Sequence, residues 1–228
     1  MMSFYRKLMF VFLGLAFALA GKAEGVLGFT QNMGQWHQNV YYKAELKSGF
    51  VYLDHEGITF QLLENGFYTK LHDWIQGTDT SSIGNGHSLK LQFLGANLNQ
   101  TITPDGDLNT VSNYYLGDDP SRWASNVKTY KRVTFHDAYP GIDLRYGSTT
   151  QNLKYDFIVT PQADPNQIEI NFEGALGLSI VDGALQIETS VGAFTELAPF
   201  AYQMNAAGHI EQVECQYSLQ NDRVKYVF

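Results

Sequence analysis

Four charged residues in the middle of the chain have the spacing of side chains that share one face of a β-hairpin. Asp143 is two residues before Arg145, and Lys154 is two residues before Asp156. Side chains two positions apart on a strand point to the same side of the sheet. If a hairpin pairs the two segments with their apolar residues together, all four charged groups lie on the opposite face.

This charged face permits two interpretations. Asp143 and Asp156 could act as the acid and base of a glycosidase, a role that requires one carboxyl group to be protonated through a raised pKa. Two basic neighbours on the same face instead favour the ionised form of both carboxylates. We therefore favour a ladder of structural ion pairs, each contributing roughly a few tenths of a kcal/mol.

Asp105, Asp107 and Asn109 place oxygen ligands at alternate positions, as a calcium-binding loop does. The pattern is weak because the rest of an EF-hand loop, including its final bidentate glutamate, is missing. An Asx-rich turn is favoured, and these three residues remain weak calcium candidates. The six histidines show none of the spacings typical of zinc sites. Motifs for nucleotides or other cofactors are missing too, so no cofactor is predicted.

A catalytic nucleophile is not indicated either. Cys215, the one cysteine, lies in an alternating segment where it shares a face with Tyr217 and Leu219. This favours an inert buried thiol, whereas a catalytic thiolate would need a histidine positioned by the fold. His136 and Asp137 are adjacent, so on a strand their side chains point to opposite faces and cannot form a relay. We predict no catalytic residues and expect that the chain is not an enzyme.

The elements that would position these residues are predicted to be short antiparallel strands. Apolar and polar residues alternate in several segments, which is typical of strands buried on one face. The apolar members are Ile58, Phe60 and Leu62; Leu89, Leu91 and Phe93; Leu153, Tyr155, Phe157 and Val159; Ile168, Ile170 and Phe172; and Val224, Tyr226 and Phe228. The pattern predicts an all-β fold, either an antiparallel β-sandwich or stacked sheets.

Turns and one helical segment complete the expected fold. Sequences that favour hairpin turns lie at residues 54–57, 64–66, 103–106 and 182–183. Asp119 and Pro120 predict about one short helical turn near Pro120, because Asp can cap it and Pro fits its first position. Residues 74–87 are expected to form a loop. We expect Val224, Tyr226 and Phe228 to complete the sheet against a hairpin partner at residues 210–219. The natural protein is expected either to continue beyond Phe228 or to use this edge for contact.

The N-terminal residues have the features of a secretion signal. Arg6 and Lys7 precede the apolar run Leu8–Ala20, and this run ends in small residues at Ala18 and Ala20. A basic start, a short apolar centre and an Ala-x-Ala end are typical of a cleavable signal peptide. A retained membrane anchor is the alternative, although the run is short for a bilayer span.

This pattern sets the domain organisation. We predict a signal peptide over residues 1–20, cleaved after Ala20 or, as a second choice, after Ala23. Residues 24–228 are predicted to form a single all-β domain, with two packed halves divided near residue 100 as the alternative.

Composition limits the partners of such an exported chain. The 228 residues are 44% hydrophobic and 17% charged, which is enough apolar material for a core. The formal net charge of −8 becomes −10 without Arg6 and Lys7, and an acidic protein lacks the basic surface that nucleic acid binding needs. No later segment is long and apolar enough for a transmembrane helix. We expect a secreted location or one at the outer cell surface.

Several ordered motifs resemble a known family. They are Asn32-Met33-Gly34-Gln35, the segment from Asn113 to Trp123, Tyr139-Pro140-Gly141-Ile142-Asp143-Leu144, the segment from Leu153 to Val159, and Ala163-Asp164-Pro165. Together they resemble the N-terminal β-rich domain of unknown function that precedes SBBP (β-propeller-type) repeats in large bacterial secreted and surface proteins. The resemblance implies neighbouring β-domains and, in many such proteins, a type IX secretion sorting domain. It implies no catalytic residues.

The motif residues are expected to be architectural. Asn113, Gly117, Pro120 and Trp123 would form a turn whose indole packs on the core, and Pro140-Gly141 would form the turn into the next strand.

These observations favour a non-catalytic extracytoplasmic module, structural or adhesion-type, at the N-terminus of a bacterial surface protein. Its partners would be other β-domains of the same or a neighbouring chain. A carbohydrate-binding module that recognises surface glycans is one alternative, because the chain is 14% aromatic and aromatic rings can line a sugar-binding face. An extracellular hydrolase is another.

Overall fold

The computed structural model describes residues 7–11, 26–78, 81, 83–99, 101–149, 152–204 and 208–228, with the backbone alone for Lys7–Val11 and Thr149. Its elements are β1 (Lys7–Val11), β2 (Phe29–Gln31), β3 (Val40–Leu46), β4 (Gly49–Asp54), β5 (Gly57–Leu63), α1 (Phe67–Gln76), β6 (Gly86–Phe93), β7 (Ile102–Tyr114), η1 (Pro120–Arg122), β8 (Ala124–Tyr139), β9 (Ile142–Thr149), β10 (Asn152–Val159), η2 (Pro165–Gln167), β11 (Glu169–Glu173), β12 (Gly177–Val181), β13 (Ala184–Thr189), β14 (Gly192–Glu196), β15 (Phe200–Met204), β16 (Ile210–Val213), β17 (Gln216–Gln220) and β18 (Arg223–Val227).

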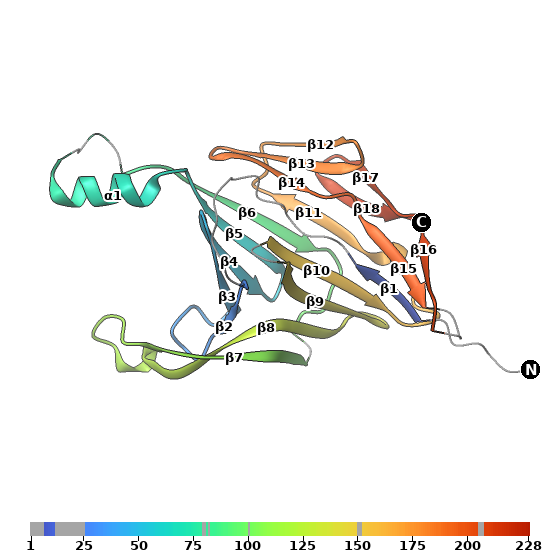
Figure 1. The fold of residues 1–228 in the computed structure, drawn as a ribbon, viewed down its shortest axis with the longest axis horizontal. Coiled ribbons are helices and arrows are strands. Elements are labelled where there is room, and N and C mark those ends of the chain that lie inside the picture. The colour runs from blue at the N-terminus through green and yellow to red at the C-terminus, as the bar shows by residue number, and fades with distance from the viewer. Residues whose placement is uncertain are drawn as a thin grey trace, which may run out of the picture.

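Most strands belong to one antiparallel 15-stranded sheet. Its hydrogen-bonded order is β16-β15-β1-β10-β9-β8-β2-β3-β4-β5-β6-β11-β18-β17, and β7 pairs with β8 beside this path. The strands β12, β13 and β14 form a separate three-stranded sheet. Figure 1 shows this small sheet beside β11, β17 and β18, and the β7–β8 ribbon along the opposite side of the molecule.

The large sheet curls so that strands far apart in its order face each other across the core. The ring of Phe157 on β10 lies 5.6 Å from that of Phe93 on β6 and 6.1 Å from that of Tyr226 on β18, between centroids. Buried Leu185 and Ile187 of the small sheet join the same apolar cluster. The predicted all-β fold of antiparallel sheets is therefore confirmed.

The predicted alternation is confirmed along most of these strands. On β5 and β6, Ile58, Phe60, Leu89 and Leu91 are buried while the residues between them are not. Such faces are buried because successive side chains of a strand point to opposite sides of the sheet. The other buried members are Leu62, Phe93, Leu153, Tyr155, Phe157, Val159, Ile168, Ile170, Phe172, Val224 and Tyr226.

The C-terminal hairpin differs from its prediction in two details. The segment 210–219 is divided into β16 and β17, and β17 pairs with β18 as expected, with Gln220 opposite Arg223. Phe228 lies beyond the end of β18 and is 40% exposed, so it does not complete the sheet. The other edge of β18 pairs with β11.

One predicted turn is wrong because its residues form bulges in a long strand. Residues 103–106 lie within β7, which pairs along most of the length of β8. Gly106 and Asn109 have φ of +70° and +53°, and the β7–β8 register shifts between Asp107 and Val111. Residues that favour turns also accommodate bulges when a long partner strand satisfies the backbone on both sides of them.

The other predicted turns agree with the structure in part. Residues 54–57 join β4 to β5 and residues 182–183 join β12 to β13, as predicted. Pro140-Gly141 also forms the expected turn, since Tyr139 pairs with Ile142 across it and Gly141 has φ of +73°. Residues 64–66, however, lead into a helix and not into a second strand of a hairpin.

That helix, α1, was not predicted. Gly66 and Gly77 flank it in left-handed conformations, and the backbone N–H groups of Gly77 and Thr78 close its last turn. It occupies the start of residues 74–87, which were expected to form a loop; residues 79, 80 and 82 lie outside the described residues. Figure 1 shows α1 extending away from the sheet, and none of its residues is buried. The short helix expected near Pro120 is confirmed as η1.

The predicted signal peptide is described only in part. Its residues Lys7–Val11 form β1, which pairs with β10 and β15 in the large sheet. The expected cleavage sites after Ala20 and Ala23 lie outside the described residues. In the described part of the chain, no helix has both the length and the apolar character needed to cross a membrane.

Candidate functional site

The loop between β2 and β3 is organised by the side chain of Asn32. Its Nδ2 donates to the backbone carbonyl oxygens of Trp36 (3.4 Å), His37 (3.0 Å) and Val40 (2.7 Å). Its Oδ1 accepts from the backbone N–H groups of Gly34 (3.0 Å) and Trp36 (3.2 Å). One side chain therefore replaces the hydrogen bonds that this irregular backbone cannot make with itself.

Gln35 holds the same loop from the inside. Its side chain is buried, its Nε2 donates to the carbonyl oxygen of Gln31 (2.7 Å), and its Oε1 accepts from the N–H of Met33 (2.7 Å). Gly34 has φ of +111°, which side chains with a Cβ rarely adopt. Three residues of the Asn-Met-Gly-Gln motif thus build the loop that presents Trp36.

Trp36 lies between two surface pockets of about 480 Å³ and 350 Å³. The first pocket includes the amide side chains of Gln31, Asn32 and Gln38. The second includes the polar side chains of Thr30, Glu45, Thr110, Ser112, Tyr114 and Thr129. We call Trp36 and these two pockets the Trp36 site.

Aromatic rings and one ammonium group surround Trp36 on the outer face of the sheet. The Nζ of Lys43 lies 3.7 Å from the ring centre of Phe50, 5.6 Å from that of Trp36 and 5.8 Å from that of Tyr52. The rings of Trp36 and Tyr114 meet edge to face at 5.5 Å. Burial lowers the pKa of Lys43, and cation–π contact with these rings favours its charged form.

This combination of groups suits a polar ligand with apolar faces. A half-buried indole offers a flat apolar surface, and the neighbouring hydroxyl, amide and carboxylate groups offer hydrogen bonds in both directions. Sugars have these two features, because their C–H groups can stack on a ring while their hydroxyls hydrogen-bond at its edges. The aromatic content of the sequence suggested a sugar-binding face but did not single out Trp36. Its position two residues after a loop-forming Asn-x-Gly sequence was the available signal.

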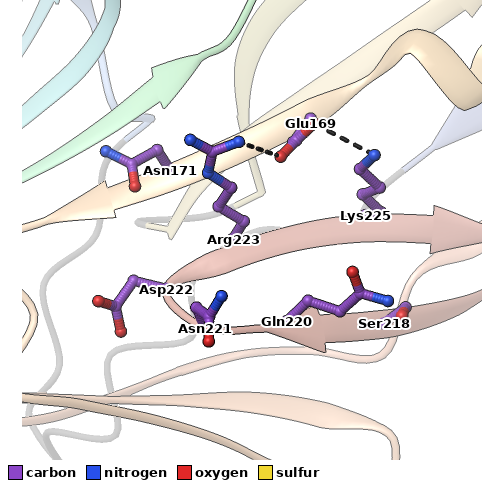
Figure 2. Close-up of a pocket in the computed structure, with 8 residues that line it drawn as sticks. All are labelled: Glu169, Asn171, Ser218, Gln220, Asn221, Asp222, Arg223 and Lys225. Carbon is purple, nitrogen blue, oxygen red and sulfur yellow. Dashed lines mark hydrogen bonds and ion pairs between the residues drawn. The ribbon is translucent and has the colours of Figure 1, made fainter.

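A second candidate is the polar pocket of about 530 Å³ on β11, β17 and β18. Figure 2 shows Glu169 between Arg223 and Lys225, with Asp222 at the hairpin tip. Glu169 accepts from both cations at 3.2 Å. Burial acts to raise the pKa of Glu169, but the hydrogen bonds from Lys225 and Arg223 outweigh it and hold the pKa below its ordinary value. Since the two cations already share this carboxylate, they are poorly available to an anionic ligand.

The weak calcium candidates are engaged in ion pairs. Asp105 accepts from Arg132, whose Nε lies 3.0 Å from its Oδ2, and Asp107 accepts from Lys128 at 2.9 Å. These hydrogen bonds lower the pKa of both carboxyl groups. Asn109, at a bulge, donates its backbone N–H to Asp107. Within the described ranges, no three His, Cys, Asp or Glu residues are grouped so that they could hold a metal ion.

The predicted charged ladder forms around Asp156. The strands β9 and β10 pair with Arg145 opposite Asp156, and the carboxylate lies 3.0 Å from Arg145 and 2.9 Å from Lys154. Asp143 is opposite Ile158 and turns instead to His136. The two carboxylates therefore have different partners, an arrangement that favours structural ion pairs over an acid–base pair.

His136 belongs to a hydrogen-bonded triplet that spans three strands. Its Nδ1 lies 3.0 Å from Oδ2 of Asp143, and its Nε2 lies 3.0 Å from the hydroxyl of Thr103. The order of groups resembles a nucleophile, a base and an orienting carboxylate. The triplet lines neither pocket of the Trp36 site nor the polar pocket, so we interpret it as a link between β7, β8 and β9. Sequence spacing could not reveal it, because the three residues come from different strands.

Trp123 does not pack on the core, contrary to the prediction. Trp123 is 44% exposed, and its indole meets the ring of Tyr115 at 5.7 Å and donates to the carbonyl oxygen of Gly117 at 3.1 Å. Asn113 accepts from the backbone N–H of Asn126. The motif therefore closes a local loop at the end of the β7–β8 ribbon, where no second layer covers the indole.

Cys215 is half-buried beside the core. Burial raises the pKa of its thiol to about 12, which leaves very little thiolate at neutral pH. We expect a thiol reagent to label the native protein about a hundredfold more slowly than the denatured protein, as measured by mass spectrometry over time. Equal rates in the two states would contradict this assignment.

Glu196, at the end of β14, is a buried carboxyl group that the sequence analysis missed. The hydroxyl of Tyr217 donates to its Oε1 at 2.9 Å, and the hydroxyl of Tyr155 donates to the same oxygen. The Oε2 is buried and has no hydrogen-bond partner among the described residues. Burial raises the pKa of Glu196, and the two tyrosine hydrogen bonds offset only part of this effect. This contact ties the small sheet to β10 and β17.

The comparisons with known proteins identify one family. Neither the curated proteins nor the solved structures gave a match to this chain. A family model does match, over residues 29–228, and this range contains all of the Trp36 site except Val26, Leu27 and Gly28. The chain belongs to the family described as "Domain of unknown function (DUF7948)".

Proposed function

We propose that this protein is a non-catalytic, adhesion-type module of an exported bacterial surface protein, and that it contacts its target through the Trp36 site. The observation that carries the proposal is the rigid presentation of an aromatic side chain. Asn32 makes five hydrogen bonds within the loop, and two of them go to the backbone of Trp36. A pre-shaped aromatic contact loses little conformational entropy when it binds.

Export is the second part of the proposal. The basic and apolar N-terminal residues support a signal peptide over residues 1–20, and therefore a secreted location or one at the outer cell surface. The ordered motifs support a position ahead of SBBP repeats, with neighbouring β-domains as partners.

Carbohydrate binding is the specific candidate for the target. It is favoured by the second pocket beside Trp36, where four side-chain hydroxyls of Thr and Ser residues and the carboxylate of Glu45 accompany the indole and Tyr114. Hydroxyls and carboxylates beside an aromatic ring are the groups that orient a sugar.

The test measures adhesion of the purified protein to a glycan array and to bacterial cells before and after periodate oxidation of their glycans. We expect Trp36→Ala to weaken binding about tenfold, the equivalent of about 1.4 kcal/mol. Trp74→Ala is the matched control, because Trp74 lies on α1 and is 48% exposed.

The outcomes separate the two candidates. Loss of adhesion after periodate, together with array hits, would support carbohydrate binding. Adhesion that survives periodate but depends on Trp36 would favour a protein target. Equal binding by the Trp36→Ala variant and the wild-type protein in every assay would overturn the proposal.

A further inference from the structure

The strand β1 fills a slot between two strands that do not pair with each other. It runs antiparallel to β10, with Leu8 opposite Val159, and antiparallel to β15, with Lys7 opposite Met204 and Val11 opposite Phe200. Figure 1 shows β1 between β10 and β15. In the hydrogen-bonded order of the sheet, the hairpin β15–β16 joins the remaining strands through β1.

The proposed processing would empty this slot. Residues 7–11 lie inside the proposed signal peptide, so cleavage after Ala20 removes β1 from the exported protein. Backbone groups of β10 and β15 would then lose their partners, and unpaired N–H and C=O groups at a strand edge attract another strand. Val159 and Ala201, both buried beside β1, would lose a neighbouring strand as well.

We propose that the slot between β10 and β15 is an acceptor site for an extended apolar segment of a partner polypeptide, an inference that rests on the proposed export. The partner segment adds as a strand antiparallel to both neighbours and pairs with β15 over five residues, as Lys7–Val11 does. Its sequence is apolar over at least four residues, because Leu8–Val11 is the sequence that occupies the slot.

The described strands of a folded second copy of this chain cannot supply that strand. A strand in the slot hydrogen-bonds along both edges, so both of its edges must be free before it enters. In the described part of the chain, every strand apart from β1 already pairs with a neighbour other than β1. The partner segment is therefore extended and unpaired before binding.

The test uses the processed protein, isolated after export from a host cell, with its N-terminus determined by mass spectrometry. Hydrogen exchange is followed for those backbone amides of residues 157–159 and 200–204 that face the slot, and for residues 58–62 and 89–91 in the core. The remaining amides of the two flanking segments face β9 and β16 and are not counted. The probe is a peptide of residues 6–12, Arg-Lys-Leu-Met-Phe-Val-Phe. The control is the same peptide with proline at the Met9 position, which removes a backbone donor and disfavours pairing.

We expect fast exchange along the slot in the processed protein, slow exchange in its core, and slot exchange about tenfold slower once the probe peptide is added. The proline peptide should leave the rates unchanged. Slot amides that are protected without peptide would show that β15 closes onto β10, and this would overturn the inference. Protection that rises with protein concentration alone would identify a second copy as the occupant and overturn it too.

Two further results would overturn the inference for other reasons. Core amides that exchange rapidly would show that the domain needs β1 to fold. An unprocessed N-terminus would show that β1 is a permanent strand and that the proposed cleavage does not occur, whereas the adhesion assays with Trp36→Ala test the binding proposal independently.

Discussion

Replacing Phe157 with alanine is expected to lower the free energy of unfolding by about 3–5 kcal/mol. Phe157 on β10 is fully buried. Its ring lies between 5.6 and 6.3 Å from the rings of Phe93, Tyr139, Tyr155 and Tyr226, which come from strands on both sides of the core. The truncation leaves a cavity where β10 faces β6 and β18 across the core. The rigid rings around this cavity cannot move to fill it. Urea unfolding followed by circular dichroism measures the change.

Phe200→Ala is the matched control for this variant. Phe200 is 38% exposed and its described ring contact is with Tyr202, so the same truncation should lower the free energy of unfolding by about 1 kcal/mol or less. Equal losses in the two variants would contradict the view that Phe157 joins the facing strands of the sheet.

Replacing Glu196 is expected to change the pH dependence of stability. Burial raises the pKa of Glu196 in the folded protein, so the protonated form favours folding. The stabilisation from protonated Glu196 is fully present below the pKa that this residue has in the unfolded chain, and it is lost as the pH rises through its pKa in the folded protein. Each pKa unit between these two values corresponds to about 1.4 kcal/mol of stability. Above the ordinary range of a glutamate pKa, the wild-type protein therefore loses stability relative to a neutral variant.

Two substitutions separate charge from packing at this position. Glu196→Gln is neutral at every pH and keeps the side-chain shape, so it should match the wild type at low pH and exceed its stability at high pH. Glu196→Ala removes the acceptor shared by Tyr155 and Tyr217 and should lower the free energy of unfolding by about 1–3 kcal/mol at low pH. This deficit should shrink as the pH rises, because alanine does not ionise and the wild type does. Denaturation curves measured at several pH values give both results. A constant difference between wild type and Glu196→Gln across pH would contradict a raised pKa.

The candidate sites show why residue spacing predicts some contacts and misses others. Arg145 and Asp156 are neighbours across a hairpin, so their ion pair follows from period-two alternation and a short connection. Trp36 was missed because its exposure depends on the hydrogen bonds of Asn32 within an irregular loop. The helix α1 was missed because its ten residues follow a turn sequence typical of hairpins, and its apolar side chains have no core beneath them.

By itself, the sequence determined the strands with clear alternation, such as β5, β6 and β10, and which of their faces are buried, together with the local pairs β9–β10 and β17–β18. These features depend on side-chain alternation and on short connections, both of which are local. Only the tertiary structure decided the order of the large sheet, its curl around Phe157 and the burial of Glu196. Alternation specifies a buried face but not the strand or sheet that covers it. That choice depends on packing between residues far apart in the chain, as in the contact between Glu196 of β14 and Tyr155 of β10.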